Sequence, residues 1–478
     1  MCGVFGVIGH PMAKEFLPTV LKSLQHRGHD SAGVAGYVTS DVSCLETVKG
    51  VGKVATVLTP ENLSKFNGST YIAHTRYCTR NEASSVREIH PHWAQSMLGK
   101  MAIVSNGDLV NVNTLIEEIR KLNVKVYTKN DAEVIAALIN IQIRRNGKKV
   151  FSSISETMNN IRGGYAALMI MEDDKRLFAF RDPWGIRPLH IGEFNINGDK
   201  CIAVASETCA FDMIQRYNLS RYPDHKVSYT HRSVKPGEII GIDANGEIES
   251  AYYKDIVRDK IGCVFESIYF SRPDSMQKQE SFQVLRERMG MELFKESPMD
   301  VDLVTAVPKG GIPSAVGFAK ASGIPYSVAI LEEPTTGGLR SFTTNDNDRQ
   351  ALATMKYNIL HDVVKDKRLL VVDDSIVRGT TARLLVKNLF AAGAKEVHLR
   401  IPCPPYSYSC FYGIETRDPK TLISHGRTIQ EINDELGTTS LAYLSLEGLY
   451  RAIKQDRSLF CDECLSNCNP MDELMVQV

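Results

Sequence analysis

The sequence predicts two successive domains, a layered α+β domain followed by an α/β domain built on a parallel sheet. The chain has 478 residues, more than one hydrophobic core usually spans, so two domains are expected. Short β-like runs with a few amphipathic helices fill roughly the first 250 residues. From about residue 300, near-continuous apolar strands alternate with helices, as in a parallel sheet covered on both faces.

The expected elements can be placed along the chain from these patterns. In the first domain the predicted strands are 34–38, 70–74, 100–107, 166–171, 176–180 and 201–206, and the predicted helices are 16–25 and 131–143. In the second domain the predicted strands are 301–308, 324–331, 368–375 and 396–402, with a helix over 381–394. The predicted domains are 1–255 and 256–440, followed by 441–478, which holds a helix and a cysteine-rich segment.

Composition excludes several classes of partner. Lys+Arg and Asp+Glu balance at 56 each, so no overall field favours nucleic acid or an anionic membrane. No apolar stretch approaches the roughly 20 residues of a membrane helix, and the N-terminus lacks the basic region of a signal peptide. Eleven cysteines without a secretory signal indicate reduced thiols, so a cytoplasmic location is expected.

Cys2 is the most informative single residue of the first domain. Removal of Met1 by methionine aminopeptidase would leave a free α-amine on the residue that carries the thiol. An α-amine has a pKa of roughly 7.7–8.0, so at neutral pH it can act as a base toward its own side chain. The alternative is a buried cysteine with no chemical role.

Five motifs follow one another in the first domain: MCGVFGVIG (1–9), LQHRGHDSAG (24–33), AHTRY (73–77), SNGDLVN (105–111) and NDAEV (130–134). Together they resemble the class II glutamine amidotransferases, which have an N-terminal-nucleophile fold of α+β class. The resemblance implies glutamine hydrolysis at Cys2.

The same resemblance implies a role for each of several other residues. The Asn106 side chain and the Gly107 backbone N–H would stabilise the oxyanion. Arg76 would bind the glutamine carboxylate, Asp131 its ammonium group, and Arg27 would shape the site. A structural ion pair is the alternative for Arg76 and Asp131. The sequence departs from the family pattern at two positions, with Ser105 where His is common and His90 where Gln often precedes Pro.

The segment RLLVVDDSIVRGTTARLL (368–385) carries the main signal of the second domain. An apolar strand ends in two carboxylates, and a Ser/Thr/Gly-rich loop then opens a helix, which forms a cradle for an anion. The alternative is a Rossmann-like turn with incidental acids. The segment resembles the type I phosphoribosyltransferases. The resemblance implies that Asp373 and Asp374 bind the ribose hydroxyls and Mg²⁺, and that the 5-phosphate lies on the loop residues Ser375, Arg378, Gly379, Thr380 and Thr381.

The two halves together resemble the glutamine phosphoribosylpyrophosphate amidotransferases. This resemblance implies that ammonia from glutamine passes through a channel to C1 of phosphoribosyl pyrophosphate, which yields phosphoribosylamine and pyrophosphate in the first step of purine synthesis. Nucleotide feedback inhibitors and a homotetramer are further expectations. Two alternatives stay open: a homologue that delivers ammonia to another phosphoribosyl-type electrophile, and a sensing protein with an inactive transferase half.

The pair Cys461-x-x-Cys464 can be a metal knuckle, a redox pair or neither. In one branch of the family, the segments that contain Cys263 and Cys410 supply the other two ligands of a [4Fe–4S] cluster. The resemblance therefore implies a structural cluster on these four cysteines, with zinc as the alternative.

Two segments depart from the family's pyrophosphate-binding pattern. The first usually reads V-P-D-S and here reads Val307-Pro308-Lys309-Gly310. The second usually carries Lys and Arg, where this chain has Glu332, Glu333 and Pro334. Carboxylates that face a pyrophosphate should cost several kcal/mol, partly offset by Lys309 and Mg²⁺. Two interpretations stay open: drift in a loop of an active enzyme, with Lys309 replacing the lost cation, or a specialised paralogue that acts on a phosphoribosyl compound without pyrophosphate, or on none. The family reaction remains the first expectation, because every other motif is present.

Overall fold

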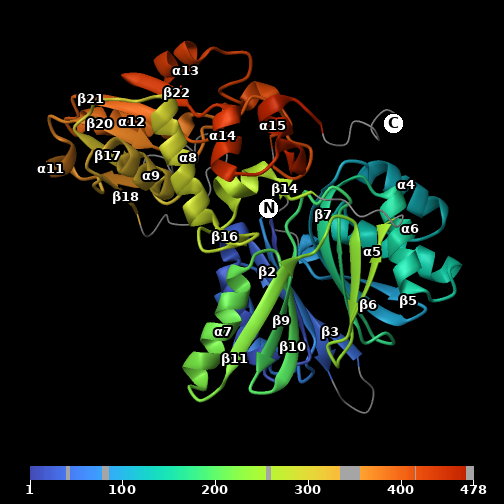
Figure 1. Ribbon diagram of the computed structural model, residues 1–478. Helices are drawn as coiled ribbons and strands as arrows, with labels where there is room; N and C mark the ends of the chain where they lie inside the picture. Colours follow the sequence, from blue (N-terminus) through green and yellow to red (C-terminus); the bar gives the residue numbers. More distant parts are fainter. Residues whose placement is uncertain (39–43, 78–85, 254–259, 334–355, 415, 470–478) are drawn as a thin grey trace. The chain divides into compact units, whose positions relative to one another are not determined.

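The computed structural model describes residues 1–38, 44–77, 86–253, 260–333, 356–414 and 416–469 (Figure 1). The chain forms two compact units. The first comprises Met1–Gly262 and Phe411–Ile414, and the second comprises Cys263–Cys410 and Glu415–Val478. Both combine helices and strands, as the sequence predicts.

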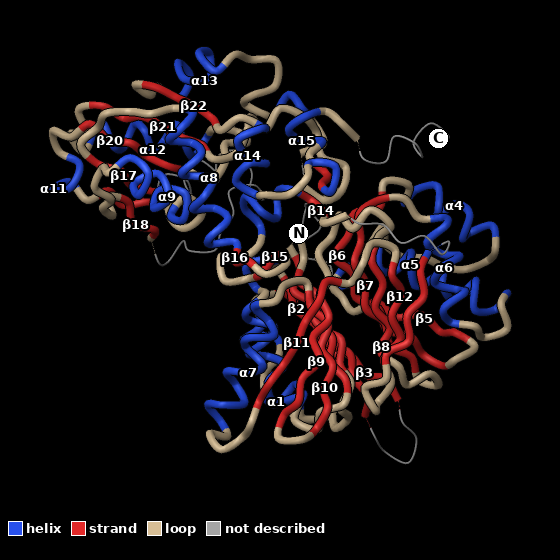
Figure 2. The backbone as a smooth tube through the Cα atoms, viewed as in Figure 1, coloured by secondary structure: helices blue, strands red, loops and turns tan. Residues whose placement is uncertain are grey.

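Two antiparallel sheets form the centre of the first unit (Figure 2). One has the strand order β11 (Val227–Ser233), β9 (His190–Ile196), β10 (Asp199–Ala205), β1 (Gly3–Ile8), β4 (Tyr71–Arg76), β2 (Ser31–Val38) and β3 (Cys44–Val51). The other has the order β13 (Ile248–Tyr252), β12 (Glu238–Ile242), β8 (Leu177–Arg181), β7 (Gly163–Met171), β6 (Gly99–Leu109) and β5 (His92–Ser96).

Helices cover the outer face of each sheet, so the first unit has four layers (Figure 1). The helices and single turns of this unit are α1 (Ala13–Ser23), η1 (Gln25–Arg27), α2 (Val54–Val57), α3 (Pro60–Leu63), η2 (Val86–Glu88), α4 (Val112–Lys121), α5 (Asp131–Arg145), α6 (Val150–Asn160) and α7 (Cys209–Arg221). Residues of α1, α2, α3 and α7 share a core with the first sheet, and residues of α4, α5 and α6 share one with the second.

A third core lies between the two sheets. Val4 and Ile72 of the first sheet are buried there with Val104 and Leu168 of the second. Strand β7 is buried along its whole length, because it has the inter-sheet core on one face and the helices on the other. Burial on both faces explains why this strand reads as the continuous apolar run AALMIM rather than as an alternating pattern.

The second unit is built on a parallel sheet, in the order β17 (Leu303–Ala306), β20 (Arg368–Val372), β21 (Glu396–Ile401) and β22 (Ser440–Tyr443). Its helices are α8 (Phe282–Glu296), α9 (Ile312–Ser322), α11 (His361–Val364), α12 (Thr380–Ala391), α13 (Ile429–Leu436), α14 (Leu446–Ile453) and α15 (Glu463–Ser466), with the turns η4 (Glu266–Phe270), η5 (Pro419–Thr421) and η6 (Arg457–Leu459). Short two-stranded sheets pair β14 (Gly262–Cys263) with β23 (Phe460–Cys461), β15 (Met276–Gln277) with β16 (Glu280–Ser281), and β18 (Ile330–Glu332) with β19 (Tyr357–Ile359). This parallel α/β architecture confirms the predicted fold class of the second half.

One predicted strand differs from the structure. The run 324–331 is not a member of the parallel sheet. Its backbone pairs with β17 at an isolated bridge from Tyr326 to Val304, and its end forms β18, which pairs antiparallel with β19. Pro325 is one reason, because it cannot donate a hydrogen bond to a neighbouring strand.

A four-residue segment from late in the sequence belongs to the first unit. The Tyr412 carbonyl accepts a hydrogen bond from Arg187 Nη2, and Tyr412 is 2% exposed. Within the described ranges, no helix is long and apolar enough to cross a lipid bilayer.

Candidate active sites

Cys2 lies just before β1, and three other segments hold it in place. Its backbone N–H donates to Asn106 Oδ1 on β6 at 3.0 Å, and its carbonyl accepts from Arg27 Nε at 3.0 Å. Its Sγ lies 4.0 Å from the carbonyl oxygen of Tyr77, just beyond β4. The structure therefore brings together Cys2, Arg27 and Asn106, which are far apart in the sequence.

The surroundings of the Cys2 thiol favour the thiolate. Burial raises its pKa, but the nearby imidazole of His74 and the N-terminal ammonium outweigh burial, and the pKa falls to about 6. A thiol with such a pKa is largely thiolate at neutral pH, which is the nucleophilic form.

Among the described residues, one of the two polar atoms of the Asn106 side chain is hydrogen-bonded and the other is not. Its Oδ1 accepts from Cys2, while its Nδ2 is buried and has no hydrogen-bond partner among the described residues. A buried donor without a partner is costly in a folded protein and needs an explanation. The next residue, Gly107, pairs with Tyr165 of β7, and a Cβ at Gly107 would lie 3.0 Å from Tyr165 Cβ. Close packing thus favours glycine at this position.

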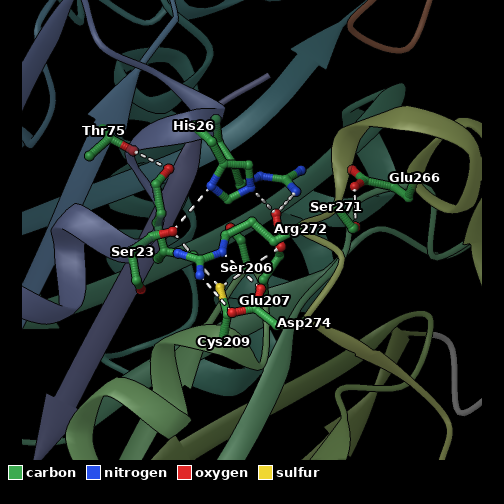
Figure 3. Close-up of polar contacts among 12 residues, drawn as sticks. Ser23, His26, Thr75, Ser206, Glu207, Cys209, Glu266, Ser271, Arg272 and Asp274 are labelled. Carbon is green, nitrogen blue, oxygen red and sulfur yellow. Dashed lines mark hydrogen bonds and ion pairs between the residues drawn. The ribbon is translucent and has the colours of Figure 1, made fainter. Parts of the chain in front are cut away.

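A buried ion pair fixes the loop that carries Arg27. Arg27 and Glu207 are 1% and 2% exposed, and Arg27 Nη1 donates to Glu207 Oε1. His26 Nε2 lies 2.7 Å from the same carboxylate oxygen, and its Nδ1 lies 3.1 Å from the Ser23 carbonyl (Figure 3). Glu207 therefore holds the turn that places Arg27 against Cys2.

Arg76 and Asp131 have structural partners of their own. Arg76 donates to the Glu88 carbonyl, and its Nη2 lies 3.6 Å from Glu88 Oε2. The Glu88 carbonyl also accepts from Asn130 Nδ2 at 3.2 Å. Asp131 is the first residue of α5, and its Oδ2 accepts from the Leu109 N–H at 3.1 Å. Glu88 thus links Arg76 to the start of α5.

The predicted phosphate loop joins β20 to α12 in the second unit. The Asp373 Oδ1 accepts from the Asp374 N–H at 2.9 Å, and Ser375 Oγ donates to Asp374 Oδ1 at 2.6 Å. Burial, and then the neighbouring Asp374 carboxylate, raise the pKa of Asp373 well above its ordinary value. Gly379 precedes α12 with φ of 77°, where a Cβ would lie 2.3 Å from Ile423 Cδ1. Only glycine suits this backbone conformation and this space.

The segments that depart from the family's pyrophosphate-binding pattern include Gly310, which lies beside Asp374. A Cβ at Gly310 would lie 1.7 Å from Asp374 Oδ2, so the Asp374 carboxylate occupies the space of any larger residue there. Lys309 Nζ lies 3.5 Å from Glu332 Oε2, and Glu333 Oε2 accepts from Asn358 Nδ2 at 2.9 Å. Pro334 lies outside the described residues. The substituted Lys309 and Glu332 therefore form an ion pair with each other.

Four cysteines gather in the second unit. Cys263 and Cys461 lie on the paired strands β14 and β23, and Cys464 lies in α15. Cys410 forms an isolated backbone β-bridge with Thr416. Burial, and after it the charges of neighbouring thiols of this set, raise the pKa of Cys461 and of Cys464. Within the described part of the chain, however, no three His, Cys, Asp or Glu side chains converge as ligands of a single metal ion.

Three residues of the first site escaped prediction from the sequence: His74, Glu88 and Glu207. His74 occurs inside AHTRY, a motif that the resemblance uses, but nothing in this motif shows which partner it would meet. Glu207 lies 180 positions from Arg27, and only the folded chain reveals the pair.

Comparisons with known proteins agree with this geometry. A family model described as a glutamine amidotransferase domain matches residues 83–213. The amidophosphoribosyltransferase of Synechococcus elongatus is 38% identical over 98% of this chain and 91% of its own length, and that of Bacillus subtilis is 37% identical over 97% and 92%. The solved structure of the B. subtilis glutamine phosphoribosylpyrophosphate amidotransferase with ADP and GMP is 36% identical, with a TM-score of 0.84 over 98% of this chain and 97% of that one.

The fold and the first site thus define an enzyme of the glutamine amidotransferase class, with a phosphoribosyltransferase-type domain in the same chain. The coverage is nearly complete in both directions, and it extends the similarity to the whole length of these relatives. The chain belongs to the amidophosphoribosyltransferase family.

Proposed function

We propose that this chain hydrolyses glutamine at Cys2 and transfers the ammonia to C1 of phosphoribosyl pyrophosphate. The products are 5-phosphoribosylamine, pyrophosphate and glutamate, and the reaction is the first step of purine synthesis. The observation that carries the proposal is the buried Cys2 thiol, with a pKa lowered to about 6, beside the unpartnered amide nitrogen of Asn106. Family membership supplies the acceptor.

In the glutaminase half, the Cys2 thiolate attacks the side-chain amide carbon of glutamine. The resulting oxyanion takes a hydrogen bond from Asn106 Nδ2, the free donor of the site, and from the Gly107 N–H. Once Met1 is removed, the nitrogen that donates to Asn106 Oδ1 becomes the α-amine, which is within reach of the thiol proton. Arg76 and Asp131 bind the carboxylate and the ammonium group of glutamine.

In the transferase half, Asp373 and Asp374 bind the ribose hydroxyls and Mg²⁺, and the loop from Ser375 to Thr381 binds the 5-phosphate at the N-terminus of α12. The residues fit this cation. Mg²⁺ is usually held by one or two carboxylates together with substrate phosphates. Burial and the neighbouring Asp374 carboxylate raise the pKa of Asp373 even though Lys356 opposes them, so a further cation beside this pair would be favourable. Bound Mg²⁺ would neutralise the charge of the substrate phosphates.

The Lys309–Glu332 ion pair supports the ordinary acceptor over an altered one. Unpaired, Glu332 would repel a pyrophosphate, but Lys309 lies 3.5 Å away and offsets its charge. Lys309 is 85% exposed, so its ammonium group is accessible to a phosphate. The two substitutions therefore compensate each other in charge.

We also propose a structural [4Fe–4S] cluster on Cys263, Cys410, Cys461 and Cys464. Support comes from the mutual effect of these thiols on their pKa values. A single zinc ion needs four ligands at about 2.0–2.3 Å from one point, whereas four irons spread their thiolates further apart. Iron and zinc analysis of protein purified without oxygen distinguishes the two.

Regulation and assembly follow from family membership. The B. subtilis relative was solved with ADP and GMP, so we propose that purine nucleotides inhibit this enzyme. We further propose a cytoplasmic homotetramer.

The function is tested by comparing glutamine-dependent and ammonia-dependent synthesis of phosphoribosylamine. Cys2→Ser should abolish the glutamine-dependent reaction and leave the ammonia-dependent reaction intact, because only the first uses the thiol. Glutamine hydrolysis by Cys2→Ser at a rate near that of the wild type would contradict the glutaminase assignment. Failure of the wild type to form phosphoribosylamine from ammonia would contradict the acceptor.

A further inference from the structure

Three buried histidines lie beside Cys2, and the proposed function leaves them without a role. His74 of β4 is 0% exposed, His90 is 4% exposed and His92 of β5 is 5% exposed. The rings of His74 and His90 are stacked, with centroids 4.0 Å apart and planes 7° apart. His92 meets His90 edge to face at 5.0 Å. The rings form a continuous polar cluster inside an apolar unit.

The strand register places His74 on the same face as Cys2. Val4 of β1 pairs directly with His74, and Cys2 is two residues before Val4, so its side chain falls on the same side of the sheet. Both residues also bond to neighbouring positions of β6. The Cys2 N–H donates to Asn106 Oδ1, and His74 Nε2 lies 3.1 Å from the Ser105 carbonyl oxygen. The thiol and the imidazole therefore meet over the same stretch of β6.

The bond to Ser105 determines which nitrogen of His74 is free. A carbonyl oxygen only accepts, so Nε2 carries a hydrogen and, in the neutral ring, Nδ1 carries the lone pair. This Nδ1 is buried and has no hydrogen-bond partner of ordinary geometry within the described ranges. Its interaction with Cys2 nevertheless lowers the thiol pKa, so the contact is looser than a formed hydrogen bond. Such contacts often tighten only when substrate binds.

The other two rings cannot compete for a proton. His90 Nδ1 accepts from the Ser105 N–H at 3.2 Å and so must keep its lone pair. Burial, and then the neighbouring His74 and His92, lower the pKa of His90 well below its ordinary value. Burial lowers the pKa of His92 to about 3. Within the described residues, His74 is thus the ring of the cluster that has an unpartnered nitrogen and interacts with the Cys2 thiol.

We propose that His74 Nδ1 is a second acceptor of the Cys2 thiol proton, beside the α-amine, and that His90 is a positioning residue that holds the His74 ring by stacking. The inference rests on the proposed hydrolysis of glutamine at Cys2. In the step, the S–H bond breaks and an Nδ1–H bond forms, which leaves a thiolate and an imidazolium. After the thiolate adds to the amide carbon, the proton passes to the departing nitrogen, ammonia leaves, and a thioester remains on Cys2. No other reagent is needed.

The charged and titratable groups around His74 are consistent with this step. Cys2 interacts with His74, and the N-terminal amine before β1 acts on Cys2. The ring of His90 is stacked on that of His74, and the uncharged Ser105 of β6 contacts His74 Nε2 through its carbonyl. After burial, Lys49 of β3 and Arg76 of β4 are among the groups that lower the pKa of His90 and of His92 on β5. Lys49 and Arg76 oppose a second positive charge, but the thiolate forms in the same step, so the net charge of the site does not change. Glu88 further offsets Arg76.

The test is the pH dependence of Cys2 alkylation by iodoacetamide, followed by mass spectrometry of the N-terminal peptide. In His74→Gln the amide nitrogen can still donate to the Ser105 carbonyl, but the side chain cannot accept a proton. Loss of the thiolate at pH 6.5, partly offset by the greater reactivity of a more basic thiolate, should slow alkylation about tenfold. The exposed Cys468 is an internal reference, and His231→Gln on β11, outside the cluster, is the matched control.

Two further variants separate the roles. In a chain that retains Met1, the α-amine is absent from Cys2, and alkylation at low pH should persist if His74 is the acceptor. His90→Gln keeps an acceptor for the Ser105 N–H but lacks the stacked ring. This variant should lower kcat for glutamine hydrolysis several-fold with little change in KM, and it should raise the pH at which Cys2 titrates by less than His74→Gln does.

An unchanged pH profile in His74→Gln would overturn the inference. So would a wild-type Cys2 that titrates near the ordinary thiol value of about 8.5, a measurement that needs no variant. A wild-type chain with a low-titrating Cys2 that fails to hydrolyse glutamine would instead contradict the proposed function. The two failures are therefore distinguishable.

Discussion

Burial acts on two reactive groups of this chain, and their neighbours decide the outcome. Burial raises the pKa of both the Cys2 thiol and the Asp373 carboxyl. Beside Cys2 lies an imidazole, so the thiol pKa nevertheless falls to about 6. Beside Asp373 lies a second carboxylate, so its pKa rises further. The neighbours thus favour the charged form of the Cys2 thiol and disfavour the charged form of the Asp373 carboxyl.

The Asn106 Nδ2 atom, which has no hydrogen-bond partner among the described residues, leads to a prediction about the rate of glutamine hydrolysis. Asn106→Ala removes the donor aimed at the oxyanion, so kcat for glutamine hydrolysis should fall about 10²–10³-fold. Ammonia-dependent synthesis should stay unchanged, because it does not pass through this site. Steady-state assays of both reactions measure the effect, with the exposed Asn160→Ala on α6 as the control. A loss of less than fivefold would exclude Asn106 as an oxyanion donor.

Asp373 leads to a prediction about stability and pH. The pKa of Asp373 is higher in the folded than in the unfolded chain, so the folded chain binds this proton more tightly. Protonation of Asp373 therefore stabilises the fold fully below about pH 4, and this stabilisation is lost as pH rises through the folded pKa. Asp373→Asn mimics the protonated form. In EDTA at pH 8 this variant should therefore have a higher Tm than the wild type, and the difference should narrow toward pH 5.

In the presence of Mg²⁺ the wild type, and not Asp373→Asn, should have the higher Tm. Mg²⁺ should raise the Tm of the wild type but not that of Asp373→Asn, which should also lose phosphoribosylamine synthesis. Asp434→Asn, at an exposed position of α13, is the control and should match the wild type throughout. If Asp373→Asn has the lower Tm in EDTA at pH 8, the folded chain does not raise the pKa of the Asp373 carboxyl.

At the scale of single residues, the motifs of the sequence point to the candidate reacting groups but not to the residues that support them. Cys2, Arg27 and Asn106 occur in recognisable motifs, and the folded chain places Arg27 and Asn106 each within hydrogen-bonding distance of Cys2. Glu207 could not be found, because an ion-pair partner 180 positions away leaves no local pattern. The role of His74 likewise depends on the register of β1 with β4, which its own motif does not specify.

Strands and helices were predictable where their pattern is uninterrupted. The buried strands β6, β7 and β10 and the helix α5 read as continuous or periodic apolar runs. Strand β1, which begins directly after Cys2, was not predicted because Gly3 and Gly6 interrupt its apolar run. A Cβ at Gly3 would lie 2.7 Å from Thr75 Oγ1, so close strand packing there is the cause.

Gly28, directly after η1, lies close to the end of β4, which leads to a prediction in which Gly50 of β3 is the control. A Cβ at Gly28 would lie 2.3 Å from the carbonyl carbon of Arg76, a backbone atom that cannot move aside. Gly28→Ala should therefore destabilise the protein by about 1–3 kcal/mol and displace Arg27 from Cys2. At Gly50 of β3 the nearest atoms are Val57 methyl groups at 3.5 Å, so Gly50→Ala should be neutral or stabilising by about 0.5 kcal/mol.

Urea denaturation of both variants measures the difference, and glutamine hydrolysis reports the position of Arg27. Equal effects of the two substitutions would show that the loop between η1 and β2 adapts to a side chain.

The whole chain forms two compact units, so a change confined to one unit need not affect the other. The three hydrophobic cores described above all belong to the first unit, and the four cysteines of the proposed cluster all belong to the second. The sequence already indicated two halves from the change in strand pattern. It could not indicate that residues 411–414 return to the first unit, because four residues are too few to carry a periodic signal.

This division leads to a prediction about iron. Cys461→Ser should release iron and increase hydrogen exchange in β14, β23 and α15, because these elements carry three of the four cysteines. Exchange in β1, β4 and β6 and the rate of glutamine hydrolysis should stay within twofold of the wild type. Cys468→Ser is the control, since this exposed thiol lies outside the proposed set. Unchanged iron content in Cys461→Ser would remove the cluster from these residues.

The return of residues 411–414 also sets an order of events during synthesis on the ribosome. The fully buried Arg187 can meet the Tyr412 carbonyl only after that residue has been translated. At about 5–20 residues per second, this happens roughly 8–30 s after Gly262, the end of the main part of the first unit, has been made. We expect nascent chains stalled with 405 residues outside the ribosome to be cleaved near Arg187 more readily than chains with 420 residues outside. The glutaminase half would then fold completely only after most of the transferase half has been synthesised. A truncated product would therefore contain an incompletely folded glutaminase half and would not release ammonia from glutamine.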